Sequence, residues 1–580
     1  MGGGALTAPE RTVHVRWLGR VRYKEAQALQ HALCSGAGQE HLLLLEHPHV
    51  YTLGVRADPR HVLTDPESVG AELVSTDRGG DVTYHGPGQL VGYPILDVAM
   101  RPGAVPAHVH AIEELVIDAL DRLGIAGCGR VEGFPGVWAD RSGPDPRKVC
   151  AIGVRIERGR SMHGFALNVD PELEMFDHIV PCGLAGRPVT SLAAEGYRGS
   201  MRAVVDAIVT LVPEHLAPGA AIERQDASWW PKRSRSTLAV ASAASSIPSP
   251  SGVGAEVPGR SLDRRLLDAG VDPGAGLALS ARKPEWVRAQ LRIGSELVKL
   301  RSTMRKLELV TVCEEAGCPN IFECWADGTA TFMINGERCT RACGFCRVDT
   351  RHPLPLDPGE PARVAEAVAR MGLSHAVVTA VARDDLDDGG AGAFAATVSE
   401  IRSRCPGSTI EVLIPDCKGD ERSLQMIVDA RPDVLNHNLE TVNRLQRAVR
   451  PSASYARSLA VLARSSAAGL TTKSGMILGM GEAVDEVLGA LGDLRAVGVD
   501  IVTLGQYLRP SAAHLPVARW WTPGEFAALG AAALAMGFAH VEASPLTRSS
   551  YHAKRAVDAA VVTTREPAGD ALVSAGAGST

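Results

Sequence analysis

The sequence predicts two domains of different fold class. The first half is expected to form an α+β domain on a mixed sheet, because its strand-like segments come in groups and do not alternate regularly with helices. The second half is expected to form an α/β domain, a partial, TIM-like (β/α)6 barrel, because short apolar strands alternate there with helical patterns. A stretch rich in Ser, Ala and Pro separates the two halves.

The elements of the first half follow from the spacing of its apolar residues. The expected strands are 13–19, 41–47, 90–98, 148–157 and 163–169. The expected helices lie near 23–34, 106–123 and 200–216. Because the strands arrive in groups, a mixed sheet is expected here.

Six β/α units are expected in the second half. The strands are 331–335, 375–381, 410–416, 433–440, 471–479 and 501–507. Helical patterns fill the gaps between them, for example near 360–371, 391–404, 452–468 and 483–497. Barrel chemistry sits where strands end, so motifs that follow these strands are the candidates for function.

The segment between the halves, residues 234–260, shows no sustained amphipathic period. Small residues, Ser and Pro dominate it, which is typical of a flexible linker. We therefore expect a first domain over 1–232, a linker over 233–280 and a second domain over 281–580, with 557–580 as a disordered tail.

The composition argues against several classes of function. The 580 residues include 60 basic and 66 acidic side chains, a net charge of −6, which does not favour nucleic acid or an anionic membrane as a partner. No apolar run reaches the roughly 18 residues of a membrane span. The N-terminus also lacks the basic start and apolar core of a signal peptide. A soluble, cytoplasmic protein is expected.

The clearest motif is Cys339, Cys343 and Cys346, spaced C-x3-C-x2-C just after the first expected barrel strand. Three thiolates would leave one iron of a [4Fe–4S] cluster without a protein ligand, so that a small molecule could bind there. A zinc knuckle is the alternative, but zinc usually takes a fourth ligand nearby and paired C-x2-C units. The spacing resembles that of the radical-SAM superfamily. This resemblance implies reductive cleavage of S-adenosylmethionine to a 5′-deoxyadenosyl radical.

A second group, Cys313, Cys318 and Cys324, is spaced C-x4-C-x5-C and again supplies three thiolates. With the first group it resembles lipoyl synthase, over about residues 283–553. Further matching pieces are RDDLDDGGA (383–391), NHNLETV (436–442), KSGMILGMGE (473–482), TLGQYLRPS (503–511) and PLTRSSYHA (545–553). The resemblance implies that the three cysteines hold an auxiliary [4Fe–4S] cluster with Ser550 as its fourth ligand.

The same resemblance implies sulfur insertion into an octanoyl chain on a protein lysine. The C–H bonds of that chain are unactivated, so a cofactor must supply the power to break them. The auxiliary cluster would donate the sulfur atoms. Gly479, Gly481 and Glu482 follow an expected strand, and two interpretations stay open. They could contact S-adenosylmethionine, since glycine lets the backbone approach a ligand closely, or form a strand-to-helix turn in which Glu482 opens the helix.

The first half contains one unusual string, RGGDVTYHGPGQL (78–90), which is interpreted as a glycine-rich loop. Such a loop could bring backbone N–H groups close to a substrate, although glycine-rich loops also form plain turns. Together with RKVCAIGVRI (147–156), HGFALNV (163–169) and FDHIVPCGL (176–184), it resembles lipoyl(octanoyl) transferase over about residues 13–220. The fold is then expected to resemble the catalytic domain of biotin and lipoate ligases.

By that resemblance, Cys182 carries the acyl group and Lys148 activates it. Acyl transfer to an amine is easier in two steps through an enzyme thioester. Lys148 could favour the thiolate as an ammonium or act as a base when neutral, and both roles stay open. Cys150 is a rival for the thiol, and the choice of Cys182 rests mainly on the family match. The implied octanoyl and pantetheine pocket consists of Arg78, Gly79, Gly80, Asp81, Val82, Thr83, Tyr84, His85, Ala151, Ile152, Gly153, Gly164, Phe165 and Ala166.

The two resemblances imply consecutive steps of lipoate biosynthesis on one bifunctional chain. The implied cofactors are two [4Fe–4S] clusters and S-adenosylmethionine. The implied partners are octanoyl-acyl carrier protein, lipoyl domains of 2-oxoacid dehydrogenase E2 subunits, the glycine cleavage H protein and a low-potential electron donor. An iron–sulfur redox sensor or scaffold with a non-catalytic acyl-binding module is the alternative, against which the open irons argue.

Overall fold

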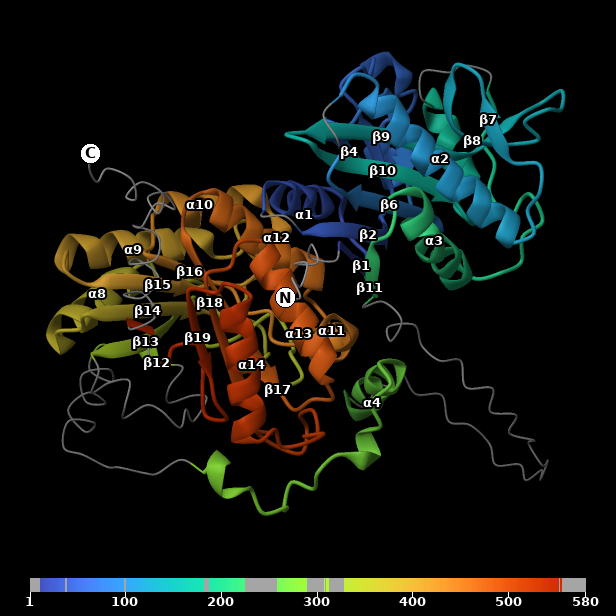
Figure 1. Ribbon diagram of the computed structural model, residues 1–580. Helices are drawn as coiled ribbons and strands as arrows, with labels where there is room; N and C mark the ends of the chain where they lie inside the picture. Colours follow the sequence, from blue (N-terminus) through green and yellow to red (C-terminus); the bar gives the residue numbers. More distant parts are fainter. Residues whose placement is uncertain are drawn as a thin grey trace, which may run out of the picture. The chain divides into compact units, whose positions relative to one another are not determined.

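The computed structural model describes residues 11–36, 39–98, 101–181, 187–224, 258–288, 307, 309–311, 328–551 and 553–554 (Figure 1). The chain divides into two compact units, here the N-terminal unit (residues 1–276, 441–464 and 481–498) and the C-terminal unit (residues 277–440, 465–480 and 499–580). An eight-stranded mixed sheet and a three-stranded sheet, here the N-terminal sheet and the small sheet, are formed by strands β1 to β11. A second eight-stranded sheet, the C-terminal sheet, is formed by β12 to β19. The predicted fold class, α+β followed by a TIM-like α/β domain, is confirmed.

The N-terminal sheet has the strand order β11-β1-β2-β6-β10-β9-β8-β7. Strand β1 pairs in parallel with β2 and β11, and every other neighbouring pair is antiparallel, so the sheet is mixed as predicted. Strands β6 and β10 are buried along their whole length, because they lie in the middle of the sheet. The bounds are β1 Thr12–Arg20, β2 Glu40–Glu46, β6 Gln89–Ile95, β7 Gly129–Val131, β8 Phe134–Ala139, β9 Arg147–Glu157, β10 Arg160–Asn168 and β11 Ala221–Arg224.

Three helices accompany this sheet, α1 (Tyr23–Ser35), α2 (Ala104–Arg122) and α3 (Met201–His215), close to the three predicted ranges. The hydroxyl of Ser200 accepts the N–H of Ala203 and so caps the start of α3. Helices α2 and α3 each bury an apolar face in the same core as the sheet, because their apolar residues recur at helical spacing. No helix in the described ranges is long and apolar enough to cross a membrane.

In the small sheet, β3 (Val50–Leu53) pairs in parallel with β4 (Glu72–Ser75) and antiparallel with β5 (Val82–His85). Strand β5 lies inside the glycine-rich string that the sequence predicts to be a loop, and the prediction is wrong for these four residues. The string is too short to show a strand period, and the partner strand β3 is remote in sequence. The glycines on either side of β5 do lie in turns, as expected.

The C-terminal sheet follows the chain from β12 to β19 in order (Figure 1). Strands β13 to β19 are parallel, and β12 is antiparallel to β13 at the edge. The six predicted strands correspond to β13 to β18, and β12 and β19 extend the predicted sheet. The bounds are β12 Val310–Thr311, β13 Thr329–Ile334, β14 His375–Ala380, β15 Thr409–Leu413, β16 Val434–Asn436, β17 Thr471–Leu478, β18 Ile501–Gln506 and β19 His540–Ala543.

Helices occur in every connection between the parallel strands of this sheet. They are α8 Glu360–Met371, α9 Ala391–Arg404, α10 Glu421–Asp429, α11 Gln446–Val449, α12 Tyr455–Ala467, α13 Val484–Ala496 and α14 Pro523–Ala535. A connection between parallel strands must cross over, which usually requires a helix. All parallel strands therefore point the same way, and the loops after them collect at one edge of the sheet.

Helix α4 (Pro258–Asp268) falls inside the segment 233–280 that is expected to be a linker. Leu266 in its last turn is 1% exposed, so this part of the segment is ordered against the protein. In α4, charged residues lie between the leucines, and the prediction of a linker did not take this pattern into account. The remaining linker residues 233–257 and the expected tail 557–580 lie outside the described residues.

A buried ion pair lies within the C-terminal sheet. The Nζ of Lys473 on β17 lies 2.9 Å from a carboxylate oxygen of Glu411 on β15, and both side chains are 1% exposed. Asn436 on β16 donates to the same carboxylate at 2.8 Å. Burial alone would raise the pKa of Glu411, but the charge of Lys473 and the contacts with His375 and Asn436 together outweigh it and lower the pKa to about 2.

Glu411→Gln should lower the free energy of unfolding of the C-terminal unit by about 3 kcal/mol, because it leaves a buried ammonium without its counter-charge. Urea unfolding of the full chain, followed by circular dichroism, measures this change. Lys473→Met in the Glu411→Gln background should recover part of the loss, since both charges are then removed. Because the pKa of Glu411 is lowered on folding, its contribution is complete above about pH 4.5 and is lost as the pH falls toward 2. An unchanged midpoint for Glu411→Gln would contradict the assignment.

Candidate active sites

A cavity of about 360 Å³ opens beside the N-terminal sheet. Its walls come from α1, the glycine-rich string, β6, β8, β9 and β10. Every residue of the predicted octanoyl pocket lines it except Val82 and Tyr84. The lining residues are Tyr23, Arg56, Arg78, Gly79, Gly80, Asp81, Thr83, His85, Val91, Tyr93, Gly133, Phe134, Pro135, Lys148, Ala151, Ile152, Gly153, His163, Gly164, Phe165 and Ala166.

Strand alternation explains the two exceptions. Thr83 and His85 on β5 line the cavity, whereas Val82 and Tyr84 are fully buried in a separate apolar cluster. Successive residues of a strand point to opposite faces, so a run of four cannot all contact one ligand. Tyr84 is held on its own side by a 2.8 Å hydrogen bond between its hydroxyl and His49.

The glycine-rich turn before β5 is held by Arg78. Its guanidinium donates to the carbonyl oxygens of Thr52, Gly79 and Asp81 at 2.7, 3.0 and 2.7 Å. A Cβ on Gly153 would come within 2.9 Å of the Gly79 carbonyl, so glycine on β9 allows the turn to pack against the strand. Arg78 is thus engaged with the backbone of the turn that it begins.

Lys148 on β9 lines the cavity, with its Nζ 4.7 Å from the ring centroid of Trp138. Cys150, two residues further along, is fully buried in the apolar core, and burial raises the pKa of its thiol. A register shift between β8 and β9 at Val137 and Trp138 separates the two positions, and such a bulge re-aims side chains. Cys150 therefore lies in a poor place for a nucleophile.

Cys182 lies outside the described residues, which end at Pro181 and resume at Arg187. The segment before it is tied down by the N–H of Val180, which donates to His61. The segment after it runs beside β9, because the N–H of Lys148 donates to Pro188 and the N–H of Thr190 donates to Lys148, both at 2.9 Å. The backbone of residues 188–190 is therefore anchored to that of Lys148.

Several cavity residues are missed by sequence reasoning. Tyr23, Tyr93 and His163 bring ring and hydroxyl groups to the wall from α1, β6 and β10. The Nε2 of His163 lies 2.9 Å from Asp77, and this hydrogen bond lowers the pKa of Asp77. The signal for His163 was its place directly before the predicted Gly164. Tyr23 and Tyr93 lie in elements with no motif, so only the tertiary fold reveals them.

The second site lies on the loop after β13. Cys339, Cys343 and Cys346 follow one another within this loop, each partly exposed. The N–H of Cys339 donates to Asp349 at 2.8 Å and that of Cys346 donates to Cys343 at 3.1 Å, so the loop turns back on itself. The N–H of Arg341 points at the sulfur of Cys339 at 3.4 Å, as do backbone amides around metal-bound thiolates.

A buried arginine fixes this loop to the sheet. Arg341 donates to both oxygens of Asp384 at 2.7 and 2.8 Å and to Asp416 at 2.6 Å. Asp384 belongs to the RDDLDDGGA string after β14, and Asp416 follows β15. The loops after three neighbouring strands are therefore joined through one guanidinium.

The loop after β18 closes the other side. His514 lies 2.9 Å from the carbonyl oxygen of Cys346, and the N–H of Leu515 donates to Gly344 at 3.0 Å. Ser511 holds the other ring nitrogen of His514 at 2.8 Å. The TLGQYLRPS motif thus leads into the segment that contacts the cysteine loop.

Ser550 lies in the turn after β19, and its neighbour Ser549 contacts Asn438, which follows β16, at 2.6 Å. Within the described residues, the hydroxyl of Ser550 makes no hydrogen bond. Cys313, Cys318 and Cys324, the other members of the expected auxiliary site, lie outside the described residues. The structure therefore places Ser550 at the same edge of the sheet as Cys339 and leaves its role as a ligand a prediction.

Gly479 has a φ of 119°, and a Cβ there would come within 2.2 Å of Gln506, so glycine lets the two strand ends pack closely. Glu482 is 5% exposed and accepts from Thr441 at 3.4 Å. It does not open α13: Ala483 precedes that helix, and its N–H donates to Glu486 at 3.0 Å. The interpretation of Glu482 as the opening residue is therefore wrong, and a contact of Gly479, Gly481 and Glu482 with a cofactor stays a prediction.

The donor set of the cysteine loop suits an iron–sulfur cluster. The pKa of Cys346 is raised by burial, and the nearby Cys339 and Glu440 add to the effect. Neighbouring thiolates of this kind are stabilised when metal ions lie between them. Three thiols on one short loop leave room for one further ligand.

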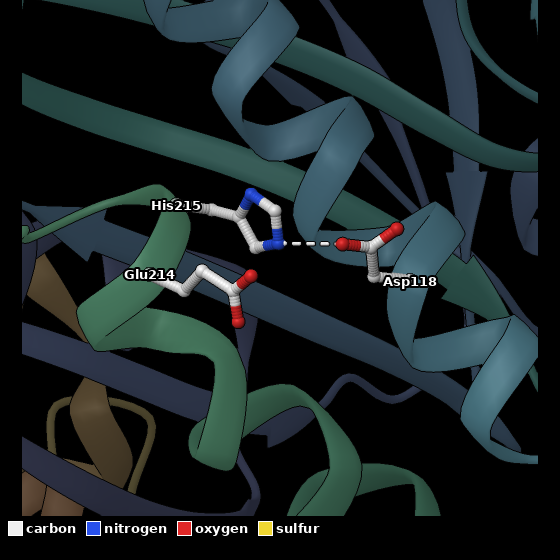
Figure 2. Close-up of side chains that lie close together, drawn as sticks. All are labelled: Asp118, Glu214 and His215. Carbon is white, nitrogen blue, oxygen red and sulfur yellow. Dashed lines mark ion pairs between the residues drawn. The ribbon is translucent and has the colours of Figure 1, made fainter.

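Among the described residues, the ligand atoms of Asp118 on α2 and of Glu214 and His215 at the end of α3 all lie within 4.8 Å of one another, as the ligands of a metal ion would (Figure 2). The Nε2 of His215 lies 2.8 Å from Asp118. Glu214 is 62% exposed and lies 3.6 Å from Arg122, so a cation already neutralises it. The group is a surface ion-pair network that links the two helices.

Comparison with known proteins finds matches in both halves of the chain. The family of lipoyl protein ligase A/B catalytic domains matches residues 22–212. The radical-SAM superfamily matches residues 333–494, and the N-terminal domain of lipoyl synthase matches residues 276–318. The chain thus joins a catalytic domain of the lipoate ligase and transferase type to a radical-SAM domain.

Curated relatives identify the second part. The lipoyl synthase of Rubrobacter xylanophilus is 56% identical over 273 residues, covering 47% of this chain and 85% of the relative. That of Mycobacterium bovis is 54% identical over 274 residues, covering 47% and 88%. The chain belongs to the lipoyl synthase family, an enzyme family that implies S-adenosylmethionine and [4Fe–4S] clusters.

Solved structures show weaker likeness. A putative lipoate protein ligase from T. acidophilum matches with 15% identity and a TM-score of 0.32, covering 37% of this chain and 88% of that one. SuiB of Streptococcus suis, bound to its precursor peptide, matches with 10% identity and a TM-score of 0.32, covering 49% and 61%.

Asp416→Asn should accelerate iron loss from the reconstituted chain about tenfold, because it weakens the support of the cysteine loop through Arg341. Transfer of iron to a chelator under anaerobic conditions measures the rate. Asp429→Asn is the control, since Asp429 is exposed and contacts Gln425 on its own helix. Equal rates for the two variants would show that Arg341 does not support the loop.

Proposed function

We propose that this chain makes protein-bound lipoyl groups in two steps. The N-terminal unit transfers octanoyl from octanoyl-acyl carrier protein, through a thioester on Cys182, to a lysine of a lipoyl domain. The C-terminal unit then inserts two sulfur atoms, at C6 and C8 of that chain. The observation that carries the proposal is the joining, in one chain, of an acyl-sized cavity with Lys148 in its wall and a three-thiol loop at the carboxyl edge of a parallel sheet.

In the first step, the cavity is the place for the acyl chain. Val91, Ile152 and Phe165 provide apolar wall, and the turn at Gly79 and Gly80 provides backbone close to the reacting end. Lys148 lies with its ammonium group over the Trp138 ring, a position that favours a cation. A cation beside Cys182 would lower the cost of the thiolate that attacks the donor thioester.

In the second half of this step, the acyl group passes from Cys182 to the acceptor lysine, and the thiol of Cys182 is released. The amine of the lipoyl-domain lysine attacks the Cys182 thioester, a C–N bond forms and the C–S bond breaks. The proton that the amine loses balances the thiolate that leaves, so the Cys182 thiol is regenerated. The backbone anchor between Lys148 and residues 188–190 supports this arrangement, because it keeps the segment after Cys182 beside Lys148. The lipoyl domains of 2-oxoacid dehydrogenase E2 subunits and the glycine cleavage H protein are the proposed acceptors.

In the second step, Cys339, Cys343 and Cys346 would hold one cluster, and Cys313, Cys318, Cys324 and Ser550 the other. When bound, these clusters and S-adenosylmethionine supply the radical chemistry and the sulfur atoms. The role of the chain's own residues is positioning: Arg341 and His514 hold the cysteine loop from its two sides. A low-potential electron donor is required as a partner.

The proposal is tested by mass spectrometry of an apo lipoyl domain. The anaerobically reconstituted chain is incubated with octanoyl-acyl carrier protein, S-adenosylmethionine and a reductant, and the lipoyl domain should gain the mass of lipoyl. Cys182→Ser should leave the domain unmodified, and Cys346→Ala should stop at octanoyl. Octanoate with ATP in place of the carrier protein distinguishes a ligase. Modification from octanoate and ATP alone, or full product with either variant, would refute the assignment.

Ser550→Ala should stop the reaction at the octanoyl domain and reduce the iron content of the chain, because it removes the fourth ligand of the auxiliary site. Ser549→Ala is the matched control: it removes the 2.6 Å contact with Asn438 but no proposed ligand. Iron and sulfide analysis, together with the mass of the lipoyl domain, measures both variants. Equal behaviour of the two would remove Ser550 from the ligand set.

A further inference from the structure

A chain of buried amide groups runs from the cavity wall to the segment beside Lys148. The imidazole Nδ1 of His85 lies 2.7 Å from Oε1 of Gln89. The Nε2 of Gln89 donates to the carbonyl oxygen of Tyr84 at 3.2 Å and to Oδ1 of Asn168 at 2.9 Å. The Nδ2 of Asn168 donates to the carbonyl oxygen of Thr190 at 2.9 Å. All three side chains are at least nine-tenths buried.

The backbone carbonyl oxygens of Tyr84 and Thr190 determine where every proton lies in this series of hydrogen bonds. A carbonyl oxygen only accepts, so Asn168 must present its NH₂ group to Thr190 and its oxygen to Gln89. Gln89 must in turn present its NH₂ group to Asn168 and Tyr84, which leaves its oxygen for His85. That oxygen also only accepts, so the Nδ1 of His85 carries the proton. The other ring nitrogen, Nε2, then carries a lone pair.

His85 lines the cavity, and within the described residues its Nε2 makes no hydrogen bond. The imidazole is stacked on Tyr23 at a centroid distance of 5.9 Å and meets His47 edge-on at 5.6 Å, so it has little freedom to turn. Burial lowers the pKa of His85 well below its usual value, and the nearby His47 and Arg78 act in the same direction. The ring is therefore neutral across the physiological range.

We propose that Gln89 and Asn168 are positioning residues: they hold His85 in the Nδ1–H tautomer, so that Nε2 presents a hydrogen-bond acceptor to an N–H group of the acyl donor in the cavity. The inference rests on the proposed function, in which a thioester of an amide-containing carrier arm occupies this cavity. The chain of amides also ends at Thr190, whose N–H donates to Lys148, so the acceptor and the proposed activating lysine share one framework.

The decisive variant is Gln89→Glu. A carboxylate accepts from His85 more strongly than an amide and favours its protonated form, in which Nε2 becomes a donor. The groups around His85 that could titrate are Tyr23 from α1, His47 before β3, Arg78 from the glycine-rich turn and His163 from β10. Each is unchanged in the variant, so the ratio of variant to wild type reports the coupled titration of His85 and the new carboxylate.

The experiment measures kcat/KM for octanoyl-pantetheine with the full chain and an apo lipoyl domain between pH 5.5 and 9. The ratio of kcat/KM for Gln89→Glu to that of the wild type should fall at least tenfold as the pH drops through the raised pKa of His85. The change should lie in KM, because a hydrogen-bond acceptor for the substrate is lost. Gln39→Glu adds the same charge at an exposed position and should give a flat ratio. A flat ratio for Gln89→Glu would overturn the inference.

A second pair of variants decides the case if Gln89→Glu does not fold. His85→Gln keeps an acceptor near the place of Nε2, whereas His85→Phe keeps only the ring that stacks on Tyr23. His85→Gln should retain about tenfold more kcat/KM than His85→Phe. Equal values would overturn the inference. Failure of the wild-type chain to use octanoyl-pantetheine at all would refute the proposed function instead.

Discussion

The parallel pairing of seven strands is the constraint on which the C-terminal unit depends. Strands β13 to β19 all run in the same direction, so the loop after each strand must emerge at the same edge of the sheet. The cysteine loop, the acidic string after β14 and the segment after β18 are far apart in sequence and meet only for this reason. Arg341, which lies in the cysteine loop, makes the meeting specific, because its guanidinium is shared by Asp384 after β14 and Asp416 after β15. Asp416 is fully buried, and a buried carboxylate is stable only beside a cation such as the guanidinium of Arg341.

The N-terminal unit organises its cavity by a different rule. Alternation along β5 sends Thr83 and His85 to the cavity and Val82 and Tyr84 to the core. The bulge between β8 and β9 separates Lys148 from Cys150. Alternation with a period of two separates the residues of β5, and an interruption of that period by the bulge separates Lys148 from Cys150. The polar cavity wall and the apolar core are thus built from the same few strands.

The sequence predicted most of the long elements, and twelve of the fourteen residues of the expected octanoyl pocket line one cavity. Strands β13 to β18 and helices α1 to α3 have strong apolar periods, and these are the elements that were found. Strands β3, β4, β5, β7, β8, β11, β12 and β19 were missed. All except β8 are runs of two to four residues, which show no period. Local pattern likewise could not reveal Arg341 as the support of the cysteine loop, since its two carboxylates lie 43 and 75 residues away. The chain of amides behind His85 is of the same kind, although its members lie in two recognised motifs.

The walls of the N-terminal cavity contain no cysteine of the radical-SAM loop. Under the proposed function the two halves would respond to oxidants differently, because clusters held by the cysteine loop would be lost, whereas the first oxidation of the Cys182 thiolate would be reversible. Synthesis as a single polypeptide keeps the copy numbers of the two halves equal, but exposure to an oxidant would make the numbers of active first and second halves unequal. A cell under oxidative stress would then accumulate the intermediate that lies between the two halves, and the ratio of intermediate to finished product would report the damage.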